Sequence, residues 1–241
     1  MKTVVICTHG LIKDAPHDFT EFKQYVEQNS VDLEVELLML YDISNRKSFK
    51  YKRKCKRLED AIVNYQKQGY KIVLVGYSFS CGLCAKMCKK YHIDKLIIVS
   101  PVIRIINRNG MKNYIKLFLK SLKSRAKATV NKKRRTRLEK MRTLYLGDLL
   151  FSCFYALHKT KRLFKYIKCP TLLMVGENDE IVYPKYLQYI HRQMKKCEYF
   201  DARFYQNANH VFIMSKKVDK TKYYSDMVDF VLHNALVTVK D

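Results

Sequence analysis

The sequence of 241 residues lacks any stretch of about 18 consecutive apolar residues, the length that a helix needs to span a bilayer. Its first residues, Met1 to Gly10, are interrupted by polar side chains too soon for a signal peptide and have the character of a first β-strand. No internal repeat is evident. Hydrophobic residues make up 48% of the chain, which is enough for a globular core and unlike a disordered protein. We therefore expect a globular, cytoplasmic protein.

A disulfide framework or a metal site is not expected either, although the chain has eight cysteines. Cys7 lies in the apolar first strand, and Cys81, Cys84 and Cys88 recur on one face of a predicted helix, where cysteine usually acts as a small hydrophobic residue. No second Cys-x-x-Cys pair supplies the remaining ligands of a metal site. We predict reduced, packed thiols, no metal and no organic cofactor.

Acidic residues are scarce in one part of the chain. Residues 102–168 contain 20 Lys or Arg but only two acids, Glu139 and Asp148, so this block has a net charge of +18. The rest of the chain has 27 basic and 20 acidic residues, and the total charge is +25. The positive excess therefore belongs mainly to one segment.

Outside this block strands alternate with helices, a pattern typical of an α/β protein with a mainly parallel sheet and helices on both of its faces. Asp18 is placed to cap the first helix, and Gly69 is placed to end the second. Six strands are predicted, over residues 3–8, 34–40, 71–75, 96–99, 171–175 and 198–205. Helices are predicted over residues 19–26, 48–68, 80–91, 184–195 and 220–235.

The basic block interrupts this alternation after the fourth strand, because it contains no clear strand. Helical patterns cover residues 111–122 and 144–157, and the segment 123–137 between them is highly basic and almost free of large apolar residues, as disordered segments are. We therefore predict three parts. Residues 1–101 form the first part of a core, residues 102–168 form a helical, strongly basic insertion, and residues 169–241 form the second part of the core.

A serine stands where the third strand turns into the next helix, in the sequence Gly76-Tyr77-Ser78-Phe79-Ser80. A sharp turn from a buried strand into a helix presents the serine hydroxyl to a substrate. Gly76 removes the Cβ that would clash in such a turn, and Ser80 keeps the other side of the turn small. Ser78 is therefore the candidate nucleophile, although many serine-containing turns of this kind are not catalytic.

Two further motifs follow Ser78, and with them the chain resembles the α/β-hydrolase superfamily over nearly its whole length. Asp179 in the loop Gly176 to Val182 resembles the acid of these enzymes, and His210 at the end of Asn207 to His210 resembles their histidine, in the order typical of the family. Residues 102–168 occupy the place where members often carry an inserted cap, as in the group of monoacylglycerol lipases and serine aminopeptidases. The chain departs from the family by lacking its first antiparallel hairpin.

The resemblance implies a catalytic role for each of these residues. His210 would take the proton of Ser78 and later protonate the leaving group. Asp179 would hold the imidazole in the correct tautomer without becoming protonated. Asp179 is alternatively a surface loop residue, His210 is alternatively a structural histidine, and Asp148 is a poorer candidate for the acid.

The resemblance also implies an oxyanion hole, formed by the backbone N–H groups of Phe79 and Leu11. His9 and Gly10 precede Leu11 at the end of the first strand, and we expect His9 to shape this loop without transferring protons. With Gly76 and Ser80, these two residues are the expected supports of the site.

The function favoured by these motifs is that of a serine hydrolase, which cleaves a small ester or an acyl lipid through an acyl-enzyme. The same triad serves thioester, lactone, amide and acyl-transfer chemistry, and the sequence does not separate these reactions. A hydrolase scaffold that only binds nucleic acid is less favoured, because such a protein has no need of a serine, an acid and a histidine in this arrangement.

The basic insertion is open to three interpretations. It attracts an anionic substrate, it contacts an anionic membrane peripherally through residues 123–137, or it is simply a solvated face. Its apolar residues either line a channel for the substrate or bury the helices of the insertion itself. These residues are Ile115, Leu119, Leu149, Phe151, Phe154 and Leu157.

Overall fold

The fold is built on a six-stranded parallel sheet, as the alternation of strands and helices predicted. The computed structural model describes residues 1–10, 17–29, 31–42, 45–103, 136–182, 184–215 and 219–233. The strands are β1 (Thr3–Thr8), β2 (Glu34–Leu38), β3 (Lys71–Tyr77), β4 (Lys95–Val99), β5 (Thr171–Gly176) and β6 (Phe200–Tyr205). They are arranged in the order β2-β1-β3-β4-β5-β6, and every neighbouring pair is parallel.

The central strands are apolar throughout because both faces of the sheet are covered. In β3, Val75 is paired with Cys7 of β1 and with Ile97 of β4, and all three side chains are fully buried. Alternate residues of each strand belong to two separate hydrophobic clusters, one on each face. The sheet therefore has no solvated face along its central strands.

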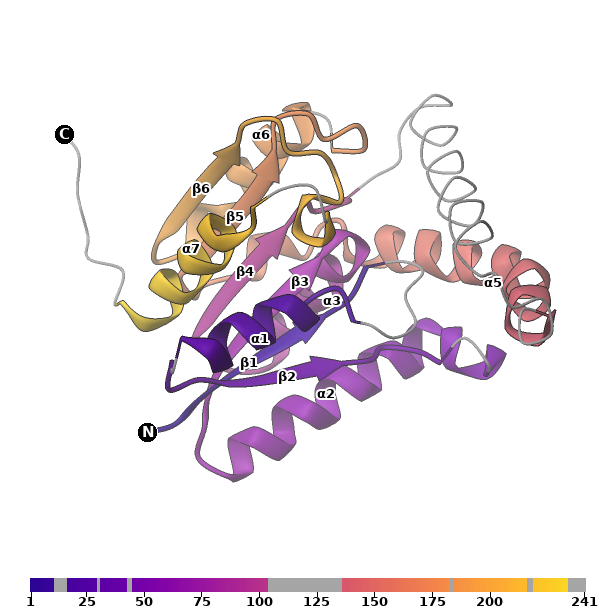
Figure 1. Ribbon diagram of the computed structural model, residues 1–241, viewed down its shortest axis with the longest axis horizontal. Helices are drawn as coiled ribbons and strands as arrows, with labels where there is room; N and C mark the ends of the chain where they lie inside the picture. The colour runs from indigo at the N-terminus through magenta and orange to yellow at the C-terminus, as the bar shows by residue number, and fades with distance from the viewer. Residues whose placement is uncertain are drawn as a thin grey trace.

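Helices cover both faces of this sheet (Figure 1). Buried residues of α1 (Thr20–Gln28) and α7 (Thr221–Leu232) pack on one face. The other face is covered by α2 (Tyr51–Lys67), α3 (Cys81–Lys90), α5 (Thr136–Thr160) and α6 (Pro184–Gln193). Short 3-10 helices complete the described part: η1 (Arg46–Phe49), η2 (Ser78–Ser80), η3 (Phe164–Tyr166), η4 (Met194–Lys196) and η5 (Phe212–Met214).

Helix α5 is the long helix in the described part of the basic insertion, and its second half packs against the core. Leu149 and Leu157 are buried, whereas Phe151 is 74% exposed to solvent. A Cβ on Gly82 of α3 would lie 2.2 Å from Oγ1 of Thr160, so the two helices approach closely at this point. Residues 111–122 and 123–135 lie outside the described part of the chain.

One predicted local feature is wrong. Asp18 does not cap the first helix, because α1 begins at Thr20 with Phe19 at its N-cap position and without a side-chain cap. The carboxylate of Asp18 instead accepts a hydrogen bond of 2.8 Å from the backbone N–H of Gly10, at the end of β1. A backbone N–H donor from a distant part of the chain therefore binds this carboxylate in place of the N–H groups at the start of α1.

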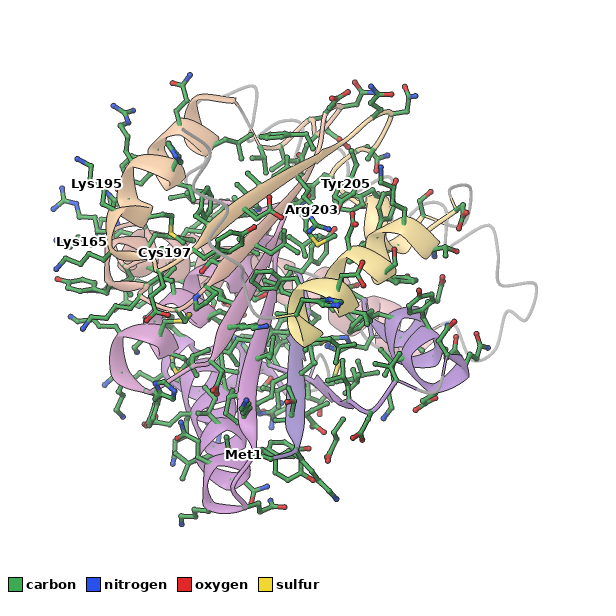
Figure 2. The ribbon with its side chains drawn as sticks, turned by 90° about the vertical axis from the view of Figure 1, so that its left-hand side faces the viewer. Met1, Lys165, Lys195, Cys197, Arg203 and Tyr205 are labelled. Carbon is green, nitrogen blue, oxygen red and sulfur yellow. The ribbon has the colours of Figure 1, made fainter. Side chains whose placement is uncertain are left out.

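The outer strand β6 is fixed to α7 by polar contacts (Figure 2). Arg203 and Asp226 form an ion pair of 2.6 Å, and the hydroxyl of Tyr205 donates a hydrogen bond of 2.8 Å to the same carboxylate. These contacts hold the strand that leads into the loop carrying His210. Within the described ranges, none of the helices combines the length and the apolar composition that crossing a bilayer requires.

Candidate active site

The carboxyl ends of the strands carry the strained residues of the structure. Among the described residues, three that are not glycine have a positive φ: Ser78 (56°), Ser100 (43°) and Asn207 (56°). They follow the ends of β3, β4 and β6, respectively. Backbone strain of this kind costs free energy and gathers at functional sites. Because the strands are parallel, these ends meet at one edge of the sheet, toward which the arrowheads point in Figure 1.

The turn at Ser78 depends on the small residues on either side. A Cβ on Gly76 would lie 2.7 Å from the Cα of Cys81, so no larger residue fits without moving the backbone. The hydroxyl of Ser80 accepts a hydrogen bond of 2.9 Å from the N–H of Tyr77, donates one of 2.8 Å to the carbonyl of Tyr77, and lies 2.9 Å from Oγ1 of Thr8. Ser80 thus ties the turn to β1.

His210 lies next to Ser78, although the two residues are far apart in the sequence. Its Nε2 lies 3.1 Å from Oγ of Ser78. The hydroxyl of Tyr77 donates a hydrogen bond of 3.0 Å to the backbone carbonyl of His210, and the two rings stack with their centroids 5.8 Å apart. The backbone N–H of His210 donates to Glu180 at 3.2 Å. The ring is therefore held from two sides and faces the serine.

Asp179 completes this arrangement on the other side of the imidazole. Both of its carboxylate oxygens lie 3.0 Å from Nδ1 of His210. An ionised carboxylate only accepts hydrogen bonds, so the proton is on Nδ1, and Nε2 is free to accept the proton of Ser78. Oδ1 of Asp179 also accepts the backbone N–H groups of Ile181 (2.9 Å) and Val182 (2.8 Å).

The pKa of Asp179 is lowered from its ordinary value by these neighbours. Burial alone would raise the pKa, because it disfavours the charged carboxylate. The charge of His210, the hydrogen bond to it and the two backbone N–H groups outweigh the burial. Asp179 is therefore held in the ionised form that can orient an imidazole.

The loop after β1 lies on the opposite side of Tyr77. His9 is fully buried, its Nε2 accepts the N–H of Leu40 at 2.9 Å, and its Nδ1 contacts the carbonyl of Gly10 at 2.7 Å. A Cβ on Gly10 would lie 2.8 Å from the ring of Tyr77, so only glycine allows this approach. The ring of Tyr77 thus lies between the loop of Gly10 and the imidazole of His210.

The structure describes one of the two residues that are predicted to donate to the oxyanion. Phe79 follows Ser78 in the first turn after β3, and its side chain is buried. Leu11 lies outside the described residues. Asp148, the alternative acid, lies in α5 and forms an ion pair with Arg46, whereas His210 is paired with Asp179.

Sequence reasoning did not find three residues that support the site. Tyr77 stands between the small Gly76 and Ser78, Glu180 follows Asp179 in the same loop, and Asp18 stands where a helix cap is expected. Each acts through a contact with a residue distant in the sequence. Such contacts leave no periodic or local signal.

A cavity of about 1110 Å³ opens at the opposite edge of the sheet, among the amino ends of the strands. Its lining includes Lys71, Lys95, Lys168 and Cys169 and none of the residues around Ser78. Lys95 donates hydrogen bonds of 2.8 Å to two carbonyls at the end of α7, where a cation complements the helix dipole. On the same side of the molecule, Lys165 and Lys195 project outward near Cys197 (Figure 2). We do not assign this cavity to the chemistry of Ser78.

All eight cysteines are free thiols. Burial raises the pKa of Cys7, Cys81 and Cys84, which disfavours their reactive thiolate forms. Within the described ranges, no group of three or more His, Cys, Asp or Glu side chains is placed to hold a metal ion.

Comparisons with known proteins agree on the fold. No family model matches the sequence, and no curated protein matches it. Among solved structures, a putative lipase from Acinetobacter baumannii AYE is 18% identical, with a TM-score of 0.64 over 96% of this chain and 84% of that one. A monoacylglycerol lipase from Paleococcus ferrophilus is 15% identical, with a TM-score of 0.59 over 95% of each chain. An esterase from Exiguobacterium antarcticum is 13% identical, with a TM-score of 0.62 over 95% of this chain and 91% of that one. The chain therefore has the α/β-hydrolase fold.

Proposed function

We propose that the protein is a serine hydrolase that cleaves a carboxylic ester through an acyl-enzyme. The observation that carries the proposal is the arrangement of three side chains, with Nε2 of His210 3.1 Å from Oγ of Ser78 and Nδ1 3.0 Å from both oxygens of Asp179. A serine hydroxyl is a weak nucleophile at neutral pH, and an adjacent base of this kind activates it.

The first half of the reaction forms the acyl-enzyme. Oγ of Ser78 attacks the carbonyl carbon of the ester while Nε2 of His210 takes the hydroxyl proton. The negative charge that develops on the carbonyl oxygen is stabilised by the backbone N–H of Phe79, and by that of Leu11 in the preceding loop. The intermediate then expels the alcohol, which receives the proton from Nε2.

The second half releases the acid. A water molecule gives a proton to Nε2 and attacks the acyl carbon, and the ester bond to Ser78 breaks as Oγ recovers its proton. Asp179 stays ionised in both halves and stabilises the imidazolium that forms in each. Its lowered pKa supports this role.

The substrate class proposed here is a small ester or an acyl lipid. Two of the structural neighbours carry the names lipase and esterase, and a third is named a monoacylglycerol lipase, which supports the ester as the bond that is cleaved. The basic insertion supports a preference for an anionic group in the substrate, because its charge of +18 raises the local concentration of anions.

Labelling with a fluorophosphonate probe tests the proposal. The probe is expected to phosphonylate Ser78 in the wild type, and Ser78→Ala should abolish both labelling and the hydrolysis of p-nitrophenyl acetate. Ser225→Ala, in which a serine at the surface of α7 is replaced, is the matched control and should behave as the wild type. A wild type that is neither labelled nor active would overturn the proposal.

A substrate series then separates ester hydrolysis from the other reactions of the same triad. Acyl chains from acetate to palmitate are compared as esters with neutral and with phosphorylated leaving groups, and as the corresponding thioesters. We expect ester turnover to exceed thioester turnover and phosphorylated leaving groups to lower the KM. If thioesters are turned over faster than esters, a thioester takes the place of the ester as the proposed substrate.

A further inference from the structure

Lys54 is a cation in the core that the proposed reaction does not use. It lies in the first turn of α2, and it is 0% exposed to solvent. Its Nζ donates hydrogen bonds to Oγ of Ser152 at 3.2 Å and to Sγ of Cys153 at 3.6 Å. In the part of the chain that the structure describes, no carboxylate forms an ion pair with it. A buried ammonium without an anion is costly, so its presence requires a reason.

Two aromatic rings take the place of an anion. Nζ of Lys54 lies 5.0 Å from the centroid of the Tyr41 ring and 5.1 Å from that of Phe79. The negative faces of aromatic rings attract a cation, most strongly where water is excluded. The ammonium therefore draws the Tyr41 and Phe79 rings toward one point.

One of these rings belongs to a donor of the proposed oxyanion hole, and the other contacts the loop that follows β1. Phe79 itself provides one of the N–H donors. Tyr41 contacts the ring of His9 edge to face, with centroids 4.8 Å apart, and the neighbouring Leu40 donates its N–H to His9. His9 in turn contacts the carbonyl of Gly10, just before Leu11. Lys54 thus lies between the Phe79 donor and the described end of the β1 loop, His9 and Gly10.

The hydrogen bonds of Lys54 join this arrangement to the basic insertion. Ser152 and Cys153 belong to α5, and the hydroxyl of Ser152 also donates to the carbonyl of Phe49 in η1. Phe49 packs edge to face on Tyr41, with centroids 5.6 Å apart. The ammonium is therefore the point at which α2, α5 and the two aromatic side chains meet.

We propose that Lys54 is a positioning residue of the oxyanion hole. Its ammonium fixes Phe79 and the Tyr41–His9 pair beneath α5, and so holds the backbone N–H donor of Phe79 and the described end of the β1 loop at His9 and Gly10. Its charge, which is fully buried, also favours the negative oxygen of the tetrahedral intermediate. This inference rests on the proposed function, because it assigns Lys54 to the hydrolysis at Ser78.

Lys54→Met separates positioning from packing. Methionine is unbranched and similar in length, so it fills the same space without a charge, and removing a buried unpaired charge should leave the Tm unchanged or raise it. Loss of one oxyanion donor lowers kcat by about 10²–10³-fold, and displacement of a donor should lower it less. We therefore expect kcat for p-nitrophenyl acetate to fall about 10- to 100-fold, with KM nearly unchanged. Binding of phenylboronic acid, which forms an anionic tetrahedral adduct with a reactive serine, should weaken in proportion to kcat.

Lys86→Met is the matched control. Nζ of Lys86 makes the same kinds of contact as Lys54, with the ring of Tyr51 (4.8 Å) and with Sγ of Cys55 (3.4 Å), but it contacts neither Tyr41 nor Phe79. This variant should keep the kcat and the boronate affinity of the wild type. If it loses as much as Lys54→Met, the effect is not specific and the inference is wrong.

Ser152→Ala provides a second variant if Lys54→Met does not fold. It removes one partner of the ammonium and should lower kcat several-fold. In the double variant, where it can be made, the loss should equal that of Lys54→Met alone, because the two residues act through one contact. If Lys54→Met has an intact Tm and an unchanged kcat, the inference is wrong but the proposed function stands. If only Ser152→Ala folds, an unchanged kcat in that variant has the same meaning. A wild type without labelling at Ser78 overturns both.

Discussion

The hydroxyl of Tyr77 donates a hydrogen bond of 3.0 Å to the backbone carbonyl of His210, while its ring stacks on the imidazole. The residue before the candidate nucleophile thus holds the candidate base. The same ring packs against Gly10 of the neighbouring loop, where a Cβ would lie only 2.8 Å away. One side chain therefore sets the spacing between the histidine loop, the serine turn and the loop after β1.

Tyr77→Phe tests the hydrogen bond without removing the ring. The carbonyl of His210 loses its partner, so we expect the free energy of unfolding to fall by about 1 kcal/mol. The imidazole should also be less well placed, and kcat should fall about 3- to 10-fold at an unchanged KM. Urea unfolding and steady-state kinetics with p-nitrophenyl acetate measure the two effects. Equal kcat values would mean that stacking alone positions the ring.

Asp179→Asn separates orientation from charge. Asparagine retains an acceptor for the N–H groups of Ile181 and Val182, but it does not hold the imidazole in the required tautomer. We expect kcat to fall about 10⁴-fold, the size of the effect of this change in a Ser-His-Asp triad. The measurement is the rate of p-nitrophenyl ester hydrolysis at neutral pH, with fluorophosphonate labelling of Ser78 slowed in parallel.

The lowered pKa of Asp179 predicts that the stability of the protein depends on pH, and the same variant tests this. The pKa of Asp179 is lower in the folded protein than its ordinary value, so its carboxylate stabilises the fold above about pH 4, the pKa of an unfolded aspartate. This contribution disappears as the pH falls through the lowered pKa. The difference in free energy of unfolding between wild type and Asp179→Asn should therefore shrink on acidification below about pH 4. A difference that stays constant down to the lowest pH at which the protein folds would contradict a charged Asp179.

Glycine positions 76 and 147 should respond to alanine with opposite signs. At Gly76 the new Cβ would lie 2.7 Å from a backbone atom, so Gly76→Ala should destabilise the fold by about 1–3 kcal/mol and distort the turn at Ser78. At Gly147, in α5, a Cβ meets nothing within 4 Å, so Gly147→Ala should stabilise the fold by about 0.5–1 kcal/mol. The Tm of each variant in thermal unfolding measures the two effects. A Gly76→Ala variant with a raised Tm would mean that the turn has room for a Cβ.

The basic run at residues 123–137 predicts binding to anionic membranes. Replacing its Lys and Arg residues by Gln should weaken binding to phosphatidylserine vesicles, because each basic residue near such a surface contributes about 1 kcal/mol. Turnover of p-nitrophenyl acetate should change little. Co-sedimentation at two salt concentrations measures the effect, with phosphatidylcholine vesicles as the control. Binding that the substitutions do not weaken would exclude this segment as the contact.

The fold could be predicted because its signals are local. Apolar runs such as residues 72–75 mark strands buried on both faces, and Gly69, which has a φ of 77°, ends α2 as expected. The alternation of strands and helices then requires a parallel sheet. The order of the strands did not follow from these signals, because pairing joins segments distant in the sequence, as β1 with β3.

The candidate site could be proposed in part for the same reason. Ser78, Asp179 and His210 follow the ends of strands and lie in recognisable loops. Asp18 and Lys54 gave no such signal. Asp18 stands where a helix cap is expected but binds Gly10, and Lys54 looks like a surface lysine on a basic helix but is fully buried. Both depend on tertiary contacts that no spacing in the sequence reveals.

Ser80→Gly keeps a small residue at the end of the serine turn, and yet it should weaken the protein. The hydroxyl of Ser80 satisfies the N–H of Tyr77 and contacts Thr8, and without it a buried donor stays unpaired, which costs about 1–3 kcal/mol. Glycine adds a further cost of about 0.5–1 kcal/mol through its freedom in the unfolded chain. We therefore expect the free energy of unfolding to fall in the order wild type, Ser80→Ala, Ser80→Gly, as measured in urea. Because the Oγ atoms of Thr8 and Ser80 form one contact, Thr8→Val should cost less in the Ser80→Ala background than in the wild type. Costs that simply add would mean that Ser80 fills space in the turn and does not join it to β1.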